Sequence, residues 1–383
     1  MKNKAWLAGL VLILALPACS LPTPAVETPT AAETAIAHST EVVATEEETE
    51  MVTETSVETE APEQPLPVVY GTGEELVVLD PATGAEINRL SAPSFGIGGK
   101  GGVSENGIFY IDYDYLNAYR VDFDGVLQEL LFLNPDGGYF EGLIYPSPDG
   151  LQVAQGAVMS FDASGSHVQL RVFNVDGTDE RVLLDATLPE QPLRPTAVKW
   201  SGDGEYLYYM NVIEGIEGYG GLDLIKVNVN TGASETIFPA AGSLMSTSVS
   251  PNEVYAARAV SGDPLGIVIR DLATGIDQTV TLPEKYRQAW QMVWAPDDSA
   301  VLVTVGLGLF MEGDTYSVIR IDPVTLEMTT LVVDDPNLLS AVAWQAMETI
   351  WLVDRDSTLW KMDSGDLTLT MVALDVQIIG ISR

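Results

Sequence analysis

A turn motif that recurs seven times constrains this fold more than any other feature of the sequence. Each copy follows an apolar run and begins with Asp or Asn, and most copies end in Gly. The seven copies are Asp80–Gly84, Asp122–Gly125, Asn174–Gly177, Asn228–Gly232, Asp271–Gly275, Asp322–Thr325 and Asp363–Gly365. Asp and Asn side chains bond to their own downstream backbone, and Gly accepts a positive φ, so each copy predicts a hairpin turn. Successive copies start 41 to 54 residues apart, which is typical of a repeat fold built from β-sheet units.

A second series of motifs marks the start of each repeat. Its members are Ser104–Gly107, Ser147–Gly150, Ser201–Gly204, Ser250–Asn252, Ala295–Asp298 and, more weakly, Gln345–Ala346. Trp200, Trp294 and Trp344 directly precede three of them, and we expect these rings to pack one repeat against the next. Strand-like runs such as Tyr206–Val212 lie between the two series, whereas helical periodicity is nearly absent.

This combination resembles the TolB-like, WD40-like β-propeller repeat family over about residues 67–383. The family pattern is a Trp-Ser-Pro-Asp-Gly strand start, an apolar strand and an Asp-x-x-Thr-Gly turn. The resemblance implies an all-β fold, a single seven-bladed propeller of four-stranded blades. It is specific for the fold and carries little information about function.

The C-terminal residues are predicted to close the ring. The first repeat has its turn at Asp80 but no strand-start motif before it, where Pro65 and Pro67 stand instead. The run Val376–Ser382 follows the last repeat and has the pattern of a first strand, with Ser382 in the place of Ser104. We expect this strand to pair into the first blade and to cover its free edge.

The N-terminus has the features of a bacterial lipoprotein signal over residues 1–19. Lys2 and Lys4 precede an apolar run, Leu7–Leu16, that is too short to span a bilayer. The sequence Leu16-Pro17-Ala18-Cys19 then resembles a lipobox, and Cys19 is the single cysteine of the chain. The resemblance implies acylation of Cys19 and an extracytoplasmic, membrane-anchored protein, at the cell surface or in the periplasm. An ordinary secretory signal with a chance cysteine is the alternative.

Residues 20–66 are predicted to form a disordered tether. They contain eleven Glu and ten Thr, and they lack Lys, Arg and aromatic residues. Such a segment cannot bury enough apolar surface to offset the entropy of ordering it. We expect a spacer between the anchor and the propeller, and its Thr-rich tracts are also candidates for O-glycosylation.

The charge of the chain restricts its partners. There are 18 Lys and Arg against 55 Asp and Glu, a formal net charge of −37. This excess repels nucleic acid and anionic lipid headgroups, and it favours basic partners or divalent cations. We therefore expect no nucleic-acid partner, and contact with the membrane only through the lipid anchor. We expect a monomer.

No group of residues predicts a catalytic site. His167 is the only histidine beyond the tether, and neither a nucleophile elbow nor a hydrolase domain accompanies it, so it is interpreted as a polar loop residue. The glycines of Gly96–Gly102 lack the Ser or Thr of a phosphate loop. The acidic runs Asp122–Gly125 and Asn174–Glu180 are interpreted as hairpin turns, and no cofactor is predicted. A calcium ion held by carboxylates in the central channel remains an alternative.

The candidate binding surface lies on the loops between the second and third strands of the repeats. In a propeller these loops emerge on one face, around the mouth of the channel. The candidate residues are Tyr113, Asp114, Tyr115, Phe161, Asp162, Tyr219, Phe310, Met311 and Asp314. Exposed aromatic rings beside acids suit a protein or carbohydrate ligand of the cell envelope, although the same side chains could pack their own loops.

The sequence therefore favours a non-catalytic binding or scaffold module displayed at the cell surface. One alternative is a propeller hydrolase, lactonase-type or glycan-active, that uses channel carboxylates and a bound calcium. The other is an accessory factor in envelope assembly, which the TolB-like resemblance implies. That family often adds a second domain to its propeller, whereas this chain has the tether in that place.

Overall fold

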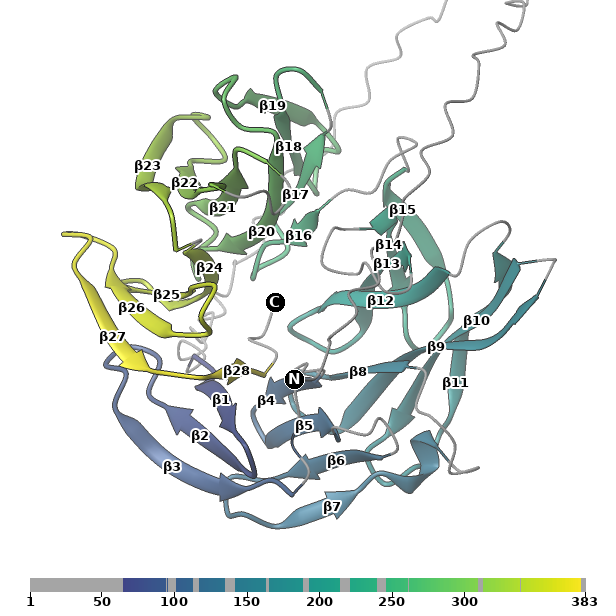
Figure 1. The fold of residues 1–383 in the computed structure, drawn as a ribbon. Coiled ribbons are helices and arrows are strands. Elements are labelled where there is room, and N and C mark those ends of the chain that lie inside the picture. The colour runs from purple at the N-terminus through teal and green to yellow at the C-terminus, as the bar shows by residue number, and fades with distance from the viewer. Residues whose placement is uncertain are drawn as a thin grey trace, which may run out of the picture. The chain divides into compact units, whose positions relative to one another are not determined.

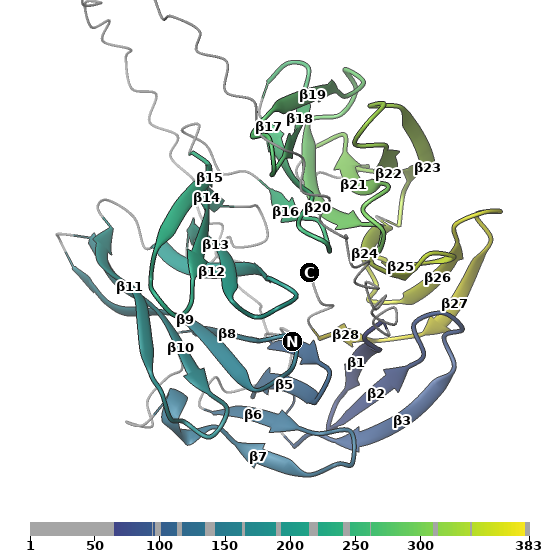
Figure 2. The same ribbon diagram turned by 180° about the vertical axis from the view of Figure 1, so that it is seen from behind.

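The fold is a ring of seven four-stranded antiparallel sheets, the blades of a β-propeller (Figure 1 and, from behind, Figure 2). The computed structural model describes residues 65–379, apart from 94, 96–100, 113–116, 135–141, 163–164, 189–192, 214–220, 240–245, 261, 309–312 and 338. The predicted all-β, seven-bladed architecture is confirmed. The predicted signal peptide and nearly all of the predicted tether lie outside the described residues.

Blades 1 to 4 are as follows, each given from its innermost strand to its outermost. Blade 1 holds β28 (Gln377–Ile378), β1 (Val68–Thr72), β2 (Glu75–Leu79) and β3 (Glu86–Ser91), and blade 2 holds β4 (Gly101–Ser104), β5 (Gly107–Ile111), β6 (Ala118–Val121) and β7 (Leu127–Glu129). Blade 3 holds β8 (Gly142–Pro146), β9 (Gln152–Asp162), β10 (Gly165–Asn174) and β11 (Arg181–Leu188), and blade 4 holds β12 (Leu193–Trp200), β13 (Tyr206–Ile213), β14 (Gly221–Asn228) and β15 (Ser234–Phe238). A short 3-10 helix, Leu131–Leu133, follows β7.

Blades 5 to 7 complete the ring in the same order. Blade 5 holds β16 (Thr247–Val249), β17 (Tyr255–Val260), β18 (Gly266–Asp271) and β19 (Asp277–Thr281), and blade 6 holds β20 (Gln288–Trp294), β21 (Val301–Gly306), β22 (Tyr316–Ile321) and β23 (Met328–Asp335). Blade 7 holds β24 (Ser340–Ala346), β25 (Thr349–Val353), β26 (Leu359–Asp363) and β27 (Leu369–Ala373).

The C-terminal strand closes the ring, as the sequence predicts. Strand β28 pairs antiparallel with β1, with Ile378 opposite Tyr70 and Gln377 opposite Gly71. The backbone N–H of Ile379 adds a 3.2 Å hydrogen bond to the carbonyl of Val69, and the Ile379 side chain is fully buried. Ser382, which was expected to extend this strand, lies outside the described residues.

Side chains of blade 7 also hold the turn between β2 and β3 of blade 1. The indole Nε1–H of Trp351 donates to the carbonyl of Pro81 at 3.1 Å, and the Thr349 hydroxyl donates to that of Ala82 at 2.8 Å. Trp351 is completely buried, so its hydrogen bond is shielded from water. Ring closure therefore rests on both a strand and a side-chain contact.

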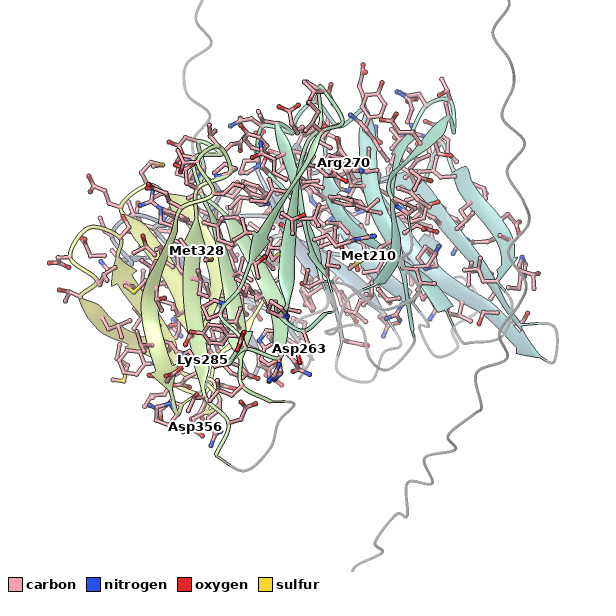
Figure 3. All side chains as sticks on the ribbon, turned by 90° about the horizontal axis from the view of Figure 1, so that it is seen from above. Met210, Asp263, Arg270, Lys285, Met328 and Asp356 are labelled. Atoms are coloured by element: carbon pink, nitrogen blue, oxygen red, sulfur yellow. The ribbon has the colours of Figure 1, made fainter. Side chains whose placement is uncertain are left out.

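The two ends of the strands define two faces of the ring. The turn face carries the turns between the first and second strands and those between the third and fourth, which bond to each other; for example, Leu272 N–H donates to the carbonyl of Val254 at 2.9 Å. The loop face carries the remaining connections. Seen from the side in Figure 3, Asp263, Lys285 and Asp356 lie on the loop face, while Arg270 lies toward the turn face.

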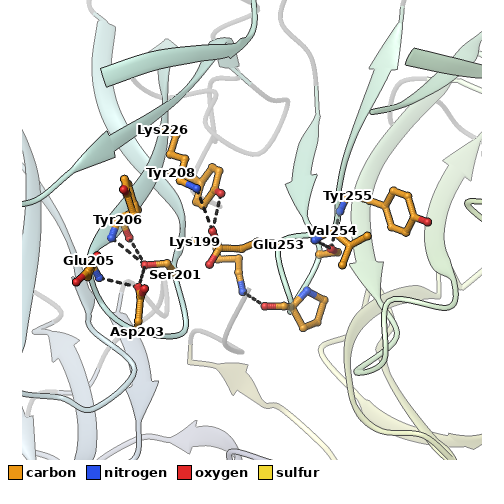
Figure 4. A network of polar contacts seen from close by, with 12 residues as sticks. Lys199, Ser201, Asp203, Glu205, Tyr206, Tyr208, Lys226, Glu253, Val254 and Tyr255 are labelled. Carbon is orange, nitrogen blue, oxygen red and sulfur yellow. Dashed lines mark hydrogen bonds and ion pairs between the residues drawn. The ribbon is translucent and has the colours of Figure 1, made fainter. Parts of the chain in front are cut away.

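The turn motifs form for the reasons that the sequence predicts. In Asp80–Gly84, Asp80 Oδ1 accepts hydrogen bonds from the backbone N–H groups of Ala82 and Thr83, and Gly84 has a φ of 76°. In the strand-start motif of blade 4, the Ser201 hydroxyl donates to Asp203 Oδ1 at 2.6 Å (Figure 4). The same two side chains accept from backbone, Asp203 Oδ1 from Glu205 N–H at 2.9 Å and Ser201 Oγ from Tyr206 N–H at 2.8 Å. The turn side chains therefore satisfy backbone groups that the sharp turns would otherwise leave unpaired.

The hydrophobic core lies mainly between successive blades. One cluster combines Ile267 and Ile269 of blade 5 with Trp294 and Val303 of blade 6, and corresponding clusters occur around the ring. Trp200 packs with residues of blade 3 and Trp344 with residues of blade 6. The expectation that this tryptophan series packs blade against blade is confirmed.

Candidate functional site

Most of the predicted binding residues fall where the structure gives no description. Tyr113, Asp114, Tyr115, Tyr219, Phe310 and Met311 lie outside the described residues, as does Cys19. Phe161 and Asp162 are the last two residues of β9, and their side chains are not described. Asp314 is the one predicted binding residue whose side chain the structure describes, so the loop-face site is built from it.

Asp314 closes the neck of the loop between β21 and β22. Its Oδ1 atom accepts hydrogen bonds from the backbone N–H groups of Gly308, at 3.0 Å, and Thr315, at 2.9 Å. The residue is 5% exposed, and its Oδ2 atom accepts no hydrogen bond within the described part of the chain. One carboxylate oxygen therefore holds the loop, and the other remains available to accept a bond.

Two aromatic rings meet at the same end of blade 6. The rings of Trp290 and Tyr316 lie edge to face, with centroids 4.6 Å apart and planes inclined by 63°. Gly306 pairs with Tyr316 across the blade, and a methyl group at Gly306 would lie 2.9 Å from the Trp290 ring. The missing side chain at Gly306 therefore lets the indole lie over strand β21. Trp290 is half-buried, and Tyr316 is buried.

Polar groups complete this site, which we call the blade 6 loop site: Gln288, Trp290, Asp314, Thr315 and Tyr316. Gln288 begins β20 and pairs with Gly306, so it lies at the loop-face end of the innermost strand. Its Oε1 atom and the hydroxyl oxygen of Thr315 are buried without a hydrogen-bond partner among the described residues. Buried polar atoms are nearly always paired with protein, water or ligand, so each of these two atoms has unused bonding capacity.

Two ion pairs lie on the loop face at blade 6. Arg287 Nη1 lies 2.9 Å from Asp263 Oδ1 of blade 5. Lys285 Nζ donates to both carboxylate oxygens of Asp334, at 2.7 and 2.8 Å, and this contact raises the pKa of Lys285. These pairs are exposed, so they contribute little stability and mainly set the local polarity.

Sequence analysis missed Trp290, Tyr316 and Gln288. They stand at the ends of strands rather than in the loops, where we looked for exposed aromatics. The one available signal was a second tryptophan four residues before Trp294, in a strand where the repeat uses one. Because a bulge lies between Ala289 and Met292, strand alternation alone does not predict which way Trp290 faces.

His167 lies in strand β10 rather than in a loop, because the β9–β10 hairpin is longer than expected. Its Nε2 atom is 2.7 Å from Asp185 Oδ1, and both side chains are exposed. This contact lowers the pKa of Asp185. His167 therefore forms a solvent-exposed contact with Asp185 on the face of a sheet.

Two further observations concern metal ligands and membrane-spanning helices. Within the ranges that the structure describes, no three His, Cys, Asp or Glu residues lie close enough together to hold a metal ion. In the same ranges, no helix is long and apolar enough to cross a membrane.

Comparisons with known proteins show the fold and no closer relationship. No protein-family model and no curated protein matches the chain. The solved structures that resemble it include a puromycin-hydrolysing peptidase of Mycobacterium tuberculosis, at 16% identity and a TM-score of 0.52 over 81% of this chain and 53% of that one. A study of two prolyl endopeptidases gives a match at 14% identity and a TM-score of 0.50, over 73% of this chain and 42% of that one.

TolB proteins are also among the structural neighbours. TolB from Acinetobacter baumannii matches at 13% identity and a TM-score of 0.47, over 81% of this chain and 80% of that one. The chain spans about half the length of the peptidases, and identities this low indicate a shared propeller fold alone.

Proposed function

We propose that this chain is an extracytoplasmic, lipid-anchored β-propeller that binds a protein or carbohydrate ligand on its loop face without catalysing a reaction. The observation that carries the proposal is the blade 6 loop site, where an aromatic pair lies at the same end of the blade as buried acceptors with unused bonding capacity. Ligand sites typically combine an apolar surface with a few convergent polar groups. A sugar ring could stack on Trp290 and donate its hydroxyls to Gln288 and Asp314.

The path of the chain supports the choice of face. Val68 begins β1 opposite Leu79, which leads into the turn at Asp80, so the described chain enters the propeller on its turn face. A tether from Cys19 would therefore reach the domain on the turn face. The loop face would then be free to meet a ligand, which is the arrangement that a displayed binding module needs.

The test of the binding face uses variants of the full domain on a glycan array and in titrations with the best glycan. We expect Trp290→Ala to weaken binding at least tenfold, because it removes the stacking surface. Asp314→Asn keeps the Oδ1 acceptor of the loop neck and should also weaken binding. Tyr206→Ala on the turn face is the control. Equal losses from Tyr206→Ala and Trp290→Ala, at unchanged stability, would contradict the proposal.

The proposed anchor has its own test. Expression of the full chain in a bacterium with labelled palmitate should give a labelled membrane protein, and Cys19→Ser should abolish the label. A labelled Cys19→Ser protein would contradict lipidation at this residue.

The alternative of a calcium-dependent propeller hydrolase predicts a different result. Purified protein would contain stoichiometric calcium, and a chelator would lower its melting temperature, because a bound ion stabilises the folded state. Under our proposal, a chelator leaves the melting temperature unchanged.

A further inference from the structure

A pocket of about 390 Å³ opens on the turn face between blades 5 and 6, away from the loop-face site. Blade 5 contributes Asn252, Val254 and Tyr255 from its strand-start turn. Blade 6 contributes Asp297 and Asp298 from its own strand-start turn, together with residues of its Asp322–Thr325 turn. Three carboxylates thus line one cavity.

Each of these carboxylates uses its Oδ1 atom to hold backbone. Asp297 Oδ1 accepts from Ser299 N–H at 3.0 Å, and Asp322 Oδ1 accepts from Val324 N–H at 2.8 Å. Asp298 Oδ1 accepts a 3.2 Å hydrogen bond from Asn252 N–H, which links blade 6 to blade 5. The three residues are therefore held in place by the turns. Backbone N–H groups do not neutralise their negative charge, so a cationic partner can still do so.

Asp298 departs from the repeat in a way that stability alone does not explain. Its φ is +61°, at a turn position where blades 3 and 4 have Gly150 and Gly204 with similar angles. The side chain is only 5% exposed, and its Oδ2 atom has no hydrogen-bond partner among the described residues. Burial raises the pKa of Asp298 against the opposing effects of Asn252 and Ser250. Strain and an unpaired buried carboxylate oxygen at one position are typical of a functional site.

Four of the remaining lining residues give the pocket an apolar wall: Val254, Tyr255, Pro323 and Val324. The Tyr255 ring lies parallel to that of Trp294, with centroids 6.0 Å apart, so packing fixes its position. Val254 and Val324 are 41% and 68% exposed, which leaves apolar surface beside the carboxylates. Such a pocket suits a ligand with both an aliphatic stem and a charged end.

The nearest basic side chains are engaged elsewhere. The positive charge of Lys199 lowers the pKa of Asp298, but its Nζ atom donates to the carbonyl of Pro251 at 2.7 Å (Figure 4). The positive charge of Arg320 lowers the pKa values of Asp297 and Asp322, but its guanidinium lies 5.9 Å from the ring centre of Trp344 in blade 7. In the described ranges, no three His, Cys, Asp or Glu residues form a group that could hold a metal ion, and this includes the three carboxylates of the pocket.

We propose that this pocket binds an aliphatic chain that ends in an ammonium or guanidinium group. Its carboxylates would attract the cation, the Tyr255 ring would offer a cation–π surface, and the two valines would cover the stem. Such a group is supplied either by a lysine or arginine of a partner protein or by a free amine.

Calorimetric titration of the full domain with N-acetyl-lysine N-methylamide, its arginine counterpart and cadaverine tests the proposal. We expect saturable binding of at least one of them, and at least tenfold weaker binding of the norleucine analogue, which has the same stem without the charge. Binding of the amino-acid amides points to a protein side chain as the natural ligand, and binding of cadaverine alone points to a free amine. Failure of all three cations to bind would overturn the proposal.

Matched variants separate this pocket from the general acidity of the surface. Asp322→Asn and Asp298→Asn keep an Oδ1 acceptor for the backbone and should weaken binding at least tenfold. Asp271→Asn makes the same change at the position of blade 5 that corresponds to Asp322, and Asp203→Asn does so at the position of blade 4 that corresponds to Asp297. Both should leave the affinity unchanged. Equal losses in all four variants would overturn the proposal. Loop-face variants such as Trp290→Ala should not affect these titrations, so the two proposals can fail independently.

Discussion

At the scale of single residues, Asp298 links stability to pH. Burial raises its pKa in the folded protein, so the folded state holds the proton more tightly than the unfolded chain does. Its contribution to stability is therefore complete below the pKa of the unfolded chain, about 4, and it is lost as the pH rises through the raised folded value. Above that raised value the buried carboxylate is charged, and it lowers the free energy of unfolding relative to its protonated form.

The variant Asp298→Asn should therefore raise the free energy of unfolding at pH 7 by about 1 kcal/mol, because the charge is removed while Asn still tolerates the positive φ. Urea denaturation at pH 7 and near pH 4 measures this, and the gain should shrink at the lower pH. Asp203→Asn is the control, since hydrogen bonds lower the pKa of Asp203. Removing the charge of Asp203 should therefore not raise the free energy of unfolding. An equal gain in both variants would contradict the argument.

A buried tyrosine joins blades 4 and 5 in the network of Figure 4. The Tyr208 hydroxyl donates to Glu253 Oε2 at 2.6 Å, and Lys226 Nζ lies 3.4 Å from the same oxygen. Burial and the nearby Glu253 raise the pKa of Tyr208, which keeps the phenol protonated as a donor. Like Asp298, Glu253 occupies a glycine position of the repeat, with a φ of 57°.

We expect Tyr208→Phe to lower the free energy of unfolding by about 1 to 2 kcal/mol, because it leaves the Glu253 carboxylate without its closest donor. A double-mutant cycle with Glu253→Gln, measured by urea denaturation, should show a coupling of at least about 0.5 kcal/mol. Tyr206→Phe is the control, since it keeps the ring over which Lys226 lies. Strictly additive effects of the first pair would show that the hydrogen bond contributes nothing.

At the scale of strands and turns, one glycine allows the backbones of two neighbouring blades to approach closely. A methyl group at Gly156 of β9 would lie 1.8 Å from the carbonyl oxygen of Pro195 in β12 of the next blade. Backbone cannot move aside as a side-chain end can, so Gly156→Ala must separate strands of blades 3 and 4.

Gly156→Ala should cost about 2 to 3 kcal/mol in the free energy of unfolding, the usual size for overpacking a buried contact. Gly202→Ala is the matched control, because nothing lies within 4 Å of its added methyl group, and it should change stability by less than about 0.5 kcal/mol. Thermal unfolding of both variants measures this. Similar melting temperatures for the two would contradict the assigned contact.

The sequence predicts elements far better than it predicts the site. Local chemistry determines each hairpin, because Asp80 bonds its own turn. A strand such as Tyr206–Ile213 is a nearly continuous apolar run, as a strand buried between two blades requires. The repeat can therefore be recognised from the residues alone. The blade 6 loop site depends instead on the bulge beside Trp290 and on the absent side chain at Gly306. The sequence alone shows that Asp298 replaces the glycine of the strand-start motif, but the burial of its side chain depends on the neighbouring blade.

At the scale of the whole molecule, ring closure should dominate stability. Deletion of residues 376–383 removes β28 and the buried Ile379, and we expect the melting temperature to fall by more than about 10 °C. Ile379→Ala should cost about 2 to 4 kcal/mol on its own, because it leaves a cavity at the start of the ring.

The control for this deletion is Leu374→Ala, at a side chain that is 59% exposed, which should leave the melting temperature within about 2 °C of the original. Calorimetry of all three proteins gives the comparison. A deletion variant that melts at the original temperature would show that the Trp351 contact holds the ring closed without the strand.

Closure by the last strand also sets the order of events during synthesis. Strands β1 to β3 emerge first, yet their blade remains one strand short until Gln377 and Ile378 have been made. Until then the chain is an open arc whose terminal blade faces are bare, and its final pairing joins residues from opposite ends of the sequence, which is slow to form. A ribosome that stops before Gln377 releases an arc with exposed apolar faces, the kind of surface that quality-control proteases and chaperones recognise. The position of β28 thus delays ring closure until the last strand of the propeller has been made.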